Sequence, residues 1–213
     1  VKPQVFAALY PLDSAEFELF RESLERLSLN DAALSYQPEQ SSALGSGFRC
    51  GFLGTLHMEI VIERLEVEHG IELLATAPTV AYQIIDSSNN LLEIENPSKY
   101  PEPNHINEVK EPIAKATMLV PEKFIGNVIS LCEEKRGIQK NLSYSGSRAV
   151  LKYEMPLNEV VFDFYDKLKS VTKGYASFDY QIEGYQEDNL VKMQILVNDE
   201  PVDALSMMVH RSK

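Results

Sequence analysis

The chain has 213 residues, of which 44% are hydrophobic and 24% charged, a composition typical of a globular protein rather than a disordered or membrane-spanning one. Its formal net charge of -12 argues against a protein that binds nucleic acid over its whole surface. The charge is uneven, because residues 1–111 carry 18 acidic and 7 basic side chains, whereas residues 112–213 carry 14 and 13. The second half is therefore favoured for any RNA-facing surface.

The cysteines and the first residues indicate the compartment. Cys50 and Cys132 lie far apart in the sequence and fit neither a metal knuckle nor a disulfide framework, which favours a reducing cytosol. The N-terminal residues lack the charged leader, apolar core and cleavage site of a secretory signal. A chain that starts at Val1 and runs directly into a strand-like pattern suggests a piece cut from a longer protein.

The first predicted elements are a strand and a helix. Residues 5–12 are apolar at both odd and even positions, as in a central strand that is covered on at least one face. Asp13 and Glu16 have the spacing of a capping box, and Leu12 and Phe17 that of a hydrophobic staple, so a helix is predicted to begin here. Its apolar stripe has helical spacing and consists of Phe17, Phe20, Leu24 and Leu27.

A hairpin, a second helix and a further strand complete this half. The hairpin strands are expected over residues 33–40 and 47–54, with a turn-rich segment between them. The helix covers residues 55–69 and ends at Gly70, and one more strand is predicted over 71–85. The order of elements is therefore β-α-β-β-α-β.

The same order repeats after residue 112. A strand, a helix, a hairpin, a helix and a strand are predicted over residues 113–121, 121–137, 140–156, 158–174 and 176–184. The last of these strands alternates apolar and polar residues, as a half-buried strand does. The predicted fold class is α+β, with two tandem ferredoxin-like (βαββαβ) split β-α-β modules and the start of a further C-terminal domain.

The predicted domain boundaries follow from these elements. The first module covers residues 1–85, and residues 86–111, rich in Pro, Asn and acids, form a linker with one short strand. The second module covers 112–187. Residues 188–213 begin an incomplete C-terminal domain with a strand and a turn at residues 198–199.

The glycine-rich residues 47–66 contain the residue types of an active site without the spacing of one. The glycines do not match a dinucleotide fingerprint, and they precede a strand where that fingerprint needs a helix. His57 and Glu59 lack the second histidine of a zinc helix, so His57 is expected to be a structural or capping residue. Neither Cys50 nor Cys132 has a neighbouring histidine that would make it a nucleophile. No catalytic, cofactor-binding or metal-binding residue is predicted.

The parity of the same strand also argues against an RNA-binding sheet of the recognition-motif kind. Three alternate residues of this strand share one face and are expected to be buried under the helices: Phe48, Cys50 and Phe52. Arg49 then lies on the open face between glycines, where no aromatic platform for stacked bases remains. In the following helix, Leu56 and Ile60 are expected to be buried.

The predicted rRNA contacts are basic residues of the second module. Three lie on or near one helix: Lys167, Lys169 and Lys173. Arg148 and Lys152 lie on a strand of the same module. The alternative is an ordinary solvated face without a partner.

Longer stretches resemble a known family. The segments "GFRCGFLGTLHMEIVIERLEVEHGIELLATAPTVAY", "NPSKYPEP" and "MPLNEVVFDFYDKLKSVTKGYASFDYQIEGYQEDNLVKMQILVNDEPVDALSMMVHR" resemble the elongation factor 4 (LepA) family of translational GTPases. They resemble its third domain, the connection that follows, and its fifth-type domain running into its C-terminal domain. Elongation factor G and the ribosomal protection proteins also have two such modules, but with another whole domain between them. Thr55 departs from the apolar residue expected there.

The resemblance implies a function in protein synthesis. Members bind the ribosome with GTP, contact both subunits and tRNA, and affect elongation through tRNA position, with back-translocation under stress as the usual proposal. Their GTP and Mg²⁺ are bound by an N-terminal G domain, whose motifs this sequence lacks. The chain is thus expected to be a non-catalytic, monomeric portion whose partners are the ribosome (rRNA, ribosomal proteins and tRNA) and its own G domain. Members are cytoplasmic and can associate peripherally with the inner face of the cell membrane.

Two other function classes stay open. A tandem ferredoxin-like regulatory module could bind a small molecule or a partner protein, and charge and fold alone allow it. An autonomous enzyme with an unrecognised carboxylate site is the other. Stabilisation by a metabolite without ribosome binding would favour the first, and GTP hydrolysis by this chain would favour the second.

Overall fold

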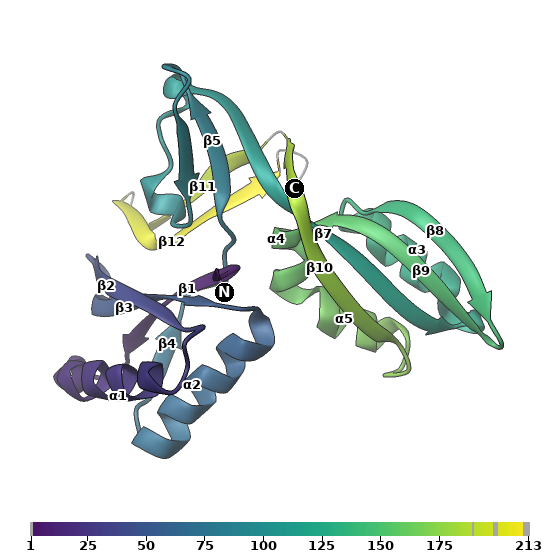
Figure 1. Ribbon diagram of the computed structural model, residues 1–213. Helices are drawn as coiled ribbons and strands as arrows, with labels where there is room; N and C mark the ends of the chain where they lie inside the picture. Colours follow the sequence, from purple (N-terminus) through teal and green to yellow (C-terminus); the bar gives the residue numbers. More distant parts are fainter. Residues whose placement is uncertain (1, 189, 198–199, 211–213) are drawn as a thin grey trace. The chain divides into compact units, whose positions relative to one another are not determined.

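The chain forms two compact units, each built around an antiparallel sheet. The computed structural model describes residues 2–188, 190–197 and 200–210. The first unit comprises Val1–Asn107 with Asn189–Lys213, and the second comprises Glu108–Asp188 (Figure 1). The predicted α+β class with two ferredoxin-like modules is confirmed. In the described part of the chain, no helix is long and apolar enough to span a membrane.

The first module has a four-stranded antiparallel sheet in the order β2-β3-β1-β4. Its strands are β1 (Val5–Pro11), β2 (Ser35–Ser41), β3 (Gly45–Phe52) and β4 (Leu73–Ala75). Helices α1 (Phe17–Leu29) and α2 (Thr55–His69) supply residues to the same core as β1 and β3. In the register, Ala7 of β1 lies opposite Cys50 of β3, and Leu9 lies opposite Ala75 of β4.

The core of this module contains the apolar stripe predicted for α1. Phe20, Leu24 and Leu27 are buried, and Phe17 packs against them. Three rings surround Phe48 of β3: Phe17 is stacked at a centroid distance of 5.4 Å, while Phe20 and Tyr36 meet it edge-on at 5.4 and 5.7 Å. Such aromatic contacts stabilise a core beyond the area they bury.

The start of α1 differs in detail from the prediction. Asp13 does act as a cap, because its Oδ1 accepts a hydrogen bond from the backbone N–H of Ala15 at 2.9 Å. The capped element is a 3-10 turn, Ser14–Glu16, and the α-helix itself begins at Phe17. Leu12 is 63% exposed, so the predicted staple does not bury it.

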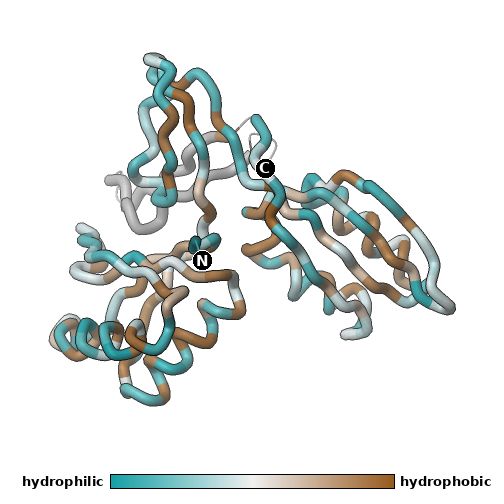
Figure 2. The backbone as a smooth tube through the Cα atoms, viewed as in Figure 1, coloured by the Kyte–Doolittle hydropathy of each residue, from teal (hydrophilic) through white to brown (hydrophobic). Residues whose placement is uncertain are grey.

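Helix α2 has the predicted bounds but buries a different face. It runs from Thr55 to His69 and ends at Gly70, which adopts φ 66 as a left-handed cap. The prediction that Leu56 and Ile60 are buried is wrong: they are 69% and 47% exposed, whereas Val61 and Leu65 are buried. The reason is that α2 carries apolar residues on both faces, so periodicity alone does not select the buried one. Figure 2 shows hydrophobic positions spread along this helix.

The single strand predicted over residues 71–85 is two strands of different sheets. Strand β4 pairs with β1, whereas β5 (Tyr82–Asp86) pairs antiparallel with β6 (Leu91–Ile94). Between β4 and β5, Pro78 interrupts the strand pattern, and Thr79 forms an isolated bridge with Phe6.

Residues 86–111, predicted to be a linker, are folded. They contain β6 and the first residues of β7 (Ile106–Pro121). The β5–β6 turn is held by Asp86, whose Oδ1 accepts from the backbone N–H of Asn90 at 2.8 Å, and Asn89 adopts φ 60. Asp and Asn favour such turns, and here their abundance marks a hairpin.

In the second unit the strands follow the order β10-β7-β9-β8. The further strands are β8 (Ile138–Ser145), β9 (Arg148–Pro156) and β10 (Ser177–Glu187). The helices are α3 (Ile125–Glu134), α4 (Leu157–Glu159) and α5 (Tyr165–Val171), the last two joined by a π-helical turn, Val160–Phe164. Pro121, predicted to be the first helical residue, ends β7, because a 3-10 turn precedes α3.

The predicted alternation of this sheet is confirmed. On β7, the side chains of Ala114, Ala116, Met118 and Val120 are buried. On β10, Phe178, Tyr180 and Ile182 are half-buried, and the residues between them are exposed. After this unit the chain forms the antiparallel hairpin of β11 (Leu190–Val197) and β12 (Glu200–His210). The turn predicted at residues 198–199 lies outside the described residues.

Candidate nucleic-acid interface

One end of the sheet in the second unit brings three separate segments together. Strand β7 ends at Pro121, which pairs with Arg148 at the start of β9. The turn into α3 is joined to the β8–β9 hairpin, because the backbone N–H of Glu122 donates to the carbonyl oxygen of Ser147 at 3.1 Å. Strand β10 begins at the same end, opposite the last residues of β7. The loop between α5 and β10 therefore lies here as well (Figure 1).

Each of these three segments contributes an exposed cation, and we call the set the basic edge: Lys123, Arg148 and Lys173. In the described part of the chain none of the three forms a salt bridge. Other lysines of the same unit do, namely Lys115 with Glu183, Lys140 with Glu154 and Lys167 with Asp163. Cations without a nearby carboxylate attract a phosphate backbone most strongly, because no internal charge offsets them.

Two further features shape the basic edge. Lys152 shares the outer face of β9 with Arg148, because strand residues separated by an even number lie on one face. Lys173 adopts φ 52 in a loop that Thr172 holds. The Thr172 hydroxyl donates to the carbonyl oxygen of Leu168 at 2.7 Å and accepts from the backbone N–H of Ala176 at 3.2 Å.

The structure gives two of the three predicted rRNA-contact residues other partners. The ammonium group of Lys167 lies 3.3 Å from a carboxylate oxygen of Asp163, and this hydrogen bond raises the pKa of Lys167. Lys169 donates to the carbonyl oxygens of Gly174 and Ala176 and so closes the end of α5. Lys173 is thus the member of the predicted set that joins the basic edge.

The opposite end of this sheet carries a network of buried charges. Arg136, which adopts φ 59 after α3, donates to both carboxylate oxygens of Glu111 at 2.7 and 3.1 Å. It also bonds Glu159 at 3.2 Å and Asp188 at 2.9 Å. Burial raises the pKa of Glu111, and the contacts with Arg136 oppose that shift. Because these charges are neutralised internally, this end is a poorer match for a phosphate backbone than the basic edge.

In the first module, the prediction that Arg49 lies on an open face is wrong. Its side chain points away from the helices but is only 7% exposed. One guanidinium nitrogen donates to the Thr79 hydroxyl at 3.0 Å and to the carbonyl oxygen of Glu95 at 2.6 Å. Asn96 of the same segment bonds Glu39 at 2.9 Å, and Gln37 bonds the Glu95 side chain at 3.2 Å. Residues 95–96 therefore cover the sheet at this point.

The glycines beside Arg49 have a packing role. A side chain at Gly47 would collide with the ring of Tyr10 and the carbonyl oxygen of Leu9, and one at Gly51 would collide with Ser35. These glycines allow neighbouring groups to approach the backbone of β3 closely.

His57 and the cysteines also have structural roles. His57 accepts a hydrogen bond from the backbone N–H of Leu53 at 3.0 Å through Nδ1, which leaves Nε2 to donate to Asp31 at 2.6 Å. These bonds agree with the prediction that His57 is a structural or capping residue. Burial raises the pKa of Cys50 and of Cys132 to about 12, so both are protonated thiols at neutral pH and poor nucleophiles. In the described residues, no group of His, Cys, Asp and Glu is arranged to hold a metal ion.

Comparison with known proteins finds a family similarity in the second unit. Residues 108–196 match the family model described as "Elongation factor G C-terminus". This part of the chain is therefore similar to the C-terminal region of elongation factor G. The basic edge and the buried charge network both lie within the matched residues.

A solved structure shows a similar fold over most of the chain. The crystal structure of ttk003000868 from Thermus thermophilus matches with a TM-score of 0.55 and 18% sequence identity. The match covers 88% of this chain and 41% of that one, so this chain spans about two fifths of the length of that protein. At this identity the likeness shows the fold alone.

Sequence reasoning did not assign Lys123 to the interface. Its neighbours Pro121 and Glu122 are joined to the β8–β9 hairpin by strand pairing and by one backbone hydrogen bond. Neither of these two interactions can be read from the sequence around Lys123. The usable signal is topological: in a ferredoxin-like module, the end of the first strand and the start of the third lie side by side. Here Arg148 is the first residue of the third strand, and Lys123 lies in the turn just after the end of the first.

Proposed function

We propose that this chain is the ribosome-binding C-terminal portion of a translational GTPase of the elongation factor 4 type. In this proposal it acts on tRNA position during elongation, as in back-translocation. The observation that carries the proposal is the match of residues 108–196 to the elongation factor G C-terminus. A second argument supports the finer assignment: the two ferredoxin-like modules are connected by a short folded segment, as in elongation factor 4, with no whole domain between them.

GTP and Mg²⁺ would then be bound by a G domain that this chain does not contain. The chain itself would transmit ribosome contacts to that domain and would hydrolyse nothing alone. A cytoplasmic location follows from the ribosome as partner, and the free thiols of Cys50 and Cys132 suit a reducing compartment.

The basic edge is the surface we propose for the rRNA contact. Lys123, Arg148 and Lys173 come from three segments that the fold holds at one end of the sheet. In the described residues none of them is neutralised by a salt bridge, so each can replace counterions on an RNA backbone. With such contacts, the logarithm of the affinity falls linearly with the logarithm of the salt concentration. The slope is proportional to the number of phosphates neutralised.

Co-sedimentation of the 213-residue chain with ribosomes at several salt concentrations tests this proposal. The triple variant Lys123→Ala, Arg148→Ala, Lys173→Ala should bind more weakly. The magnitude of its salt slope, the change of log affinity with log salt concentration, should fall by about 3, one for each phosphate that is no longer neutralised. The matched control replaces three salt-bridged lysines of the same unit, Lys115, Lys140 and Lys167, and should change the slope much less.

A third variant separates the two sets of predicted contacts. Lys167→Ala, Lys169→Ala, Lys173→Ala should lose only the contribution of Lys173, because the other two already have internal partners. Equal slopes for wild type and the basic-edge variant would overturn the assignment of the interface. Absence of ribosome binding by the wild-type chain, together with stabilisation by a metabolite, would overturn the proposed function in favour of a regulatory module.

A further inference from the structure

Helix α2 in the first unit has a line of exposed aliphatic side chains on the face turned away from its own core. Leu56 and Ile60 are exposed, as described above, and Val67 is 76% exposed. The three lie at i, i+4 and i+11, which places them along one side of an α-helix. We call them the α2 outer stripe. The opposite side of the helix packs Val61 and Leu65 into the core, so the stripe is not needed for folding.

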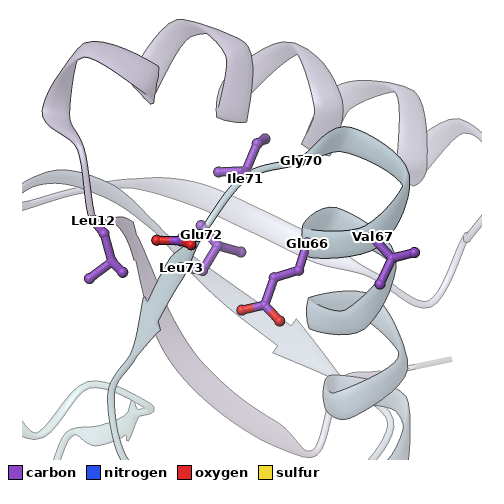
Figure 3. A pocket seen from close by; sticks show the side chains of 7 residues that line it. All are labelled: Leu12, Glu66, Val67, Gly70, Ile71, Glu72 and Leu73. Atoms are coloured by element: carbon purple, nitrogen blue, oxygen red, sulfur yellow. The ribbon is translucent and has the colours of Figure 1, made fainter.

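The stripe ends in a hollow at the C-terminal end of α2. The hollow has a volume of about 620 Å³, and Leu12, Val67 and Leu73 contribute aliphatic side chains to it. Figure 3 shows the carboxylates of Glu66 and Glu72 in the space between Leu12 and α2. The hollow and the stripe share Val67, so the aliphatic stripe leads into a hollow of mixed character that has two carboxylates inside it.

Four carboxylates beside this surface form no salt bridge in the described part of the chain, whereas Glu68 of the same helix is paired with Arg64 at 3.0 Å. The four are Glu59, Glu63, Glu66 and Glu72, and all of them are exposed. Helix α1 shows the contrasting arrangement, because Arg21 bonds both Glu18 and Glu25. An aliphatic stripe flanked by free carboxylates complements a surface that presents aliphatic and positively charged side chains together.

We propose that the α2 outer stripe and its hollow dock a basic amphipathic helix of another protein, with its aliphatic side chains on the stripe and its Lys or Arg side chains on the glutamates. Two helices packed side by side bury such stripes against each other. A second copy of this chain is a poorer occupant, because a twofold contact would place the same carboxylates against one another. RNA is a poorer occupant for the same reason of charge. This proposal concerns the first unit and does not depend on the function proposed for the second.

The test uses the 213-residue chain labelled with ¹⁵N and an amphipathic helical peptide of leucine and lysine as the probe. NMR titration should show saturable shifts for the amides of Leu56, Ile60 and Val67. The double variant Ile60→Ser, Val67→Ser should weaken binding by roughly tenfold or more, as expected for truncating two central contacts. Both positions are exposed, so the remaining amide shifts should stay those of the folded wild type.

Matched variants separate the aliphatic contribution from the charged one. Leu19→Ser, Leu29→Ser removes two exposed leucines of α1 and should leave affinity unchanged. Replacing Glu59, Glu63 and Glu66 by Gln should weaken binding and reduce its salt dependence. A peptide with glutamate in place of lysine should not bind.

Four outcomes would overturn the proposal. Shifts that map to another face would show that the site lies elsewhere, and unchanged affinity of the Ser double variant would show that the stripe makes no contact. Competition by an RNA oligonucleotide at the same amides would identify RNA as the ligand of this face. Concentration-dependent dimerisation that disappears in Ile60→Ser, Val67→Ser would identify a second copy as the occupant.

Discussion

Replacing Arg49 by methionine removes a buried charge while leaving most of the aliphatic stem in place. The guanidinium donates to the Thr79 hydroxyl at 3.0 Å and to the carbonyl oxygen of Glu95 at 2.6 Å. A hydrogen bond that involves a charged group contributes about 1.5–3 kcal/mol, so these two stabilise the first unit by about 3–6 kcal/mol before opposing terms are counted.

The opposing terms are visible in the same contacts. Arg49 Nε and Glu39 Oε2 have no hydrogen-bond partner in the described residues, and Glu39 lies 3.8 Å from the guanidinium, too far for a hydrogen bond. Burial of an incompletely paired charge costs several kcal/mol, which cancels part of the gain. We therefore expect Arg49→Met to lower the free energy of unfolding of the first unit by about 3 kcal/mol. Arg49→Lys should lower the free energy of unfolding by less, because the charge remains and only the planar arrangement of guanidinium donors is lost.

Hydrogen exchange at increasing urea concentration measures each unit separately. With a slope of about 2 kcal/mol per molar urea, the midpoint for amides of Val5–Pro11 should fall by about 1.5 M, while that for Arg148–Pro156 should not move. Arg26→Met, at an exposed arginine of α1, is the matched control and should change stability by less than about 0.5 kcal/mol. If Arg49→Met proved as stable as wild type, the contacts of Arg49 would merely offset its burial, and the reasoning would fail.

Three further predictions concern the first unit or both cores. Cys50 and Cys132, with pKa values of about 12 from burial, should resist iodoacetamide in the folded chain and react after denaturation, as mass spectrometry would show. Burial raises the pKa of Asp31, but the hydrogen bond from His57 and others outweigh it, so its pKa lies below the usual 3.8. Its contribution to stability is thus present above that value and lost as pH falls below it. In urea titrations at decreasing pH, Asp31→Asn should therefore lose less stability on acidification than wild type. An equal loss in both proteins would refute this role of Asp31. Gly47→Ala should destabilise the first unit by about 1–3 kcal/mol in the same exchange assay, because an aromatic ring and a carbonyl oxygen occupy the space; wild-type stability would show that the strand can shift.

The elements that sequence predicted well are those with local determinants. Helix α2 begins at Thr55 and ends at Gly70 as expected, because a glycine in the left-handed conformation stops a helix without tertiary help. The inward pattern of β7 and β10 follows from strict alternation. In contrast, the face that α2 buries depends on which neighbour covers it, and its two apolar faces look alike in sequence. Residues 86–111 looked like a linker because turn-forming and strand-ending residues have the same composition.

The candidate interface was predictable only in part. Basic residues of the second half were considered for this surface: Lys173 was one of the predicted contacts, and Arg148 was noted in the same module without being one of them. Whether a lysine is free or neutralised is a tertiary property: Lys167 has Asp163 as a partner four residues away and Glu134 on another helix. The role of Arg49 was misjudged for a similar reason, because its partners are 30 and 46 residues away.

The loop from Thr172 to Ala176 has a consequence for affinity. Thr172 bonds Leu168 and Ala176, and Lys169 bonds Gly174 and Ala176, so both ends of this short loop are fastened to α5. The backbone of Lys173 is therefore preorganised before any partner arrives. Only the side chain must lose freedom on binding, which saves roughly 1–2 kcal/mol for each backbone residue that would otherwise be ordered. Thr172→Val should loosen this loop and weaken a contact made by Lys173 without changing any charge.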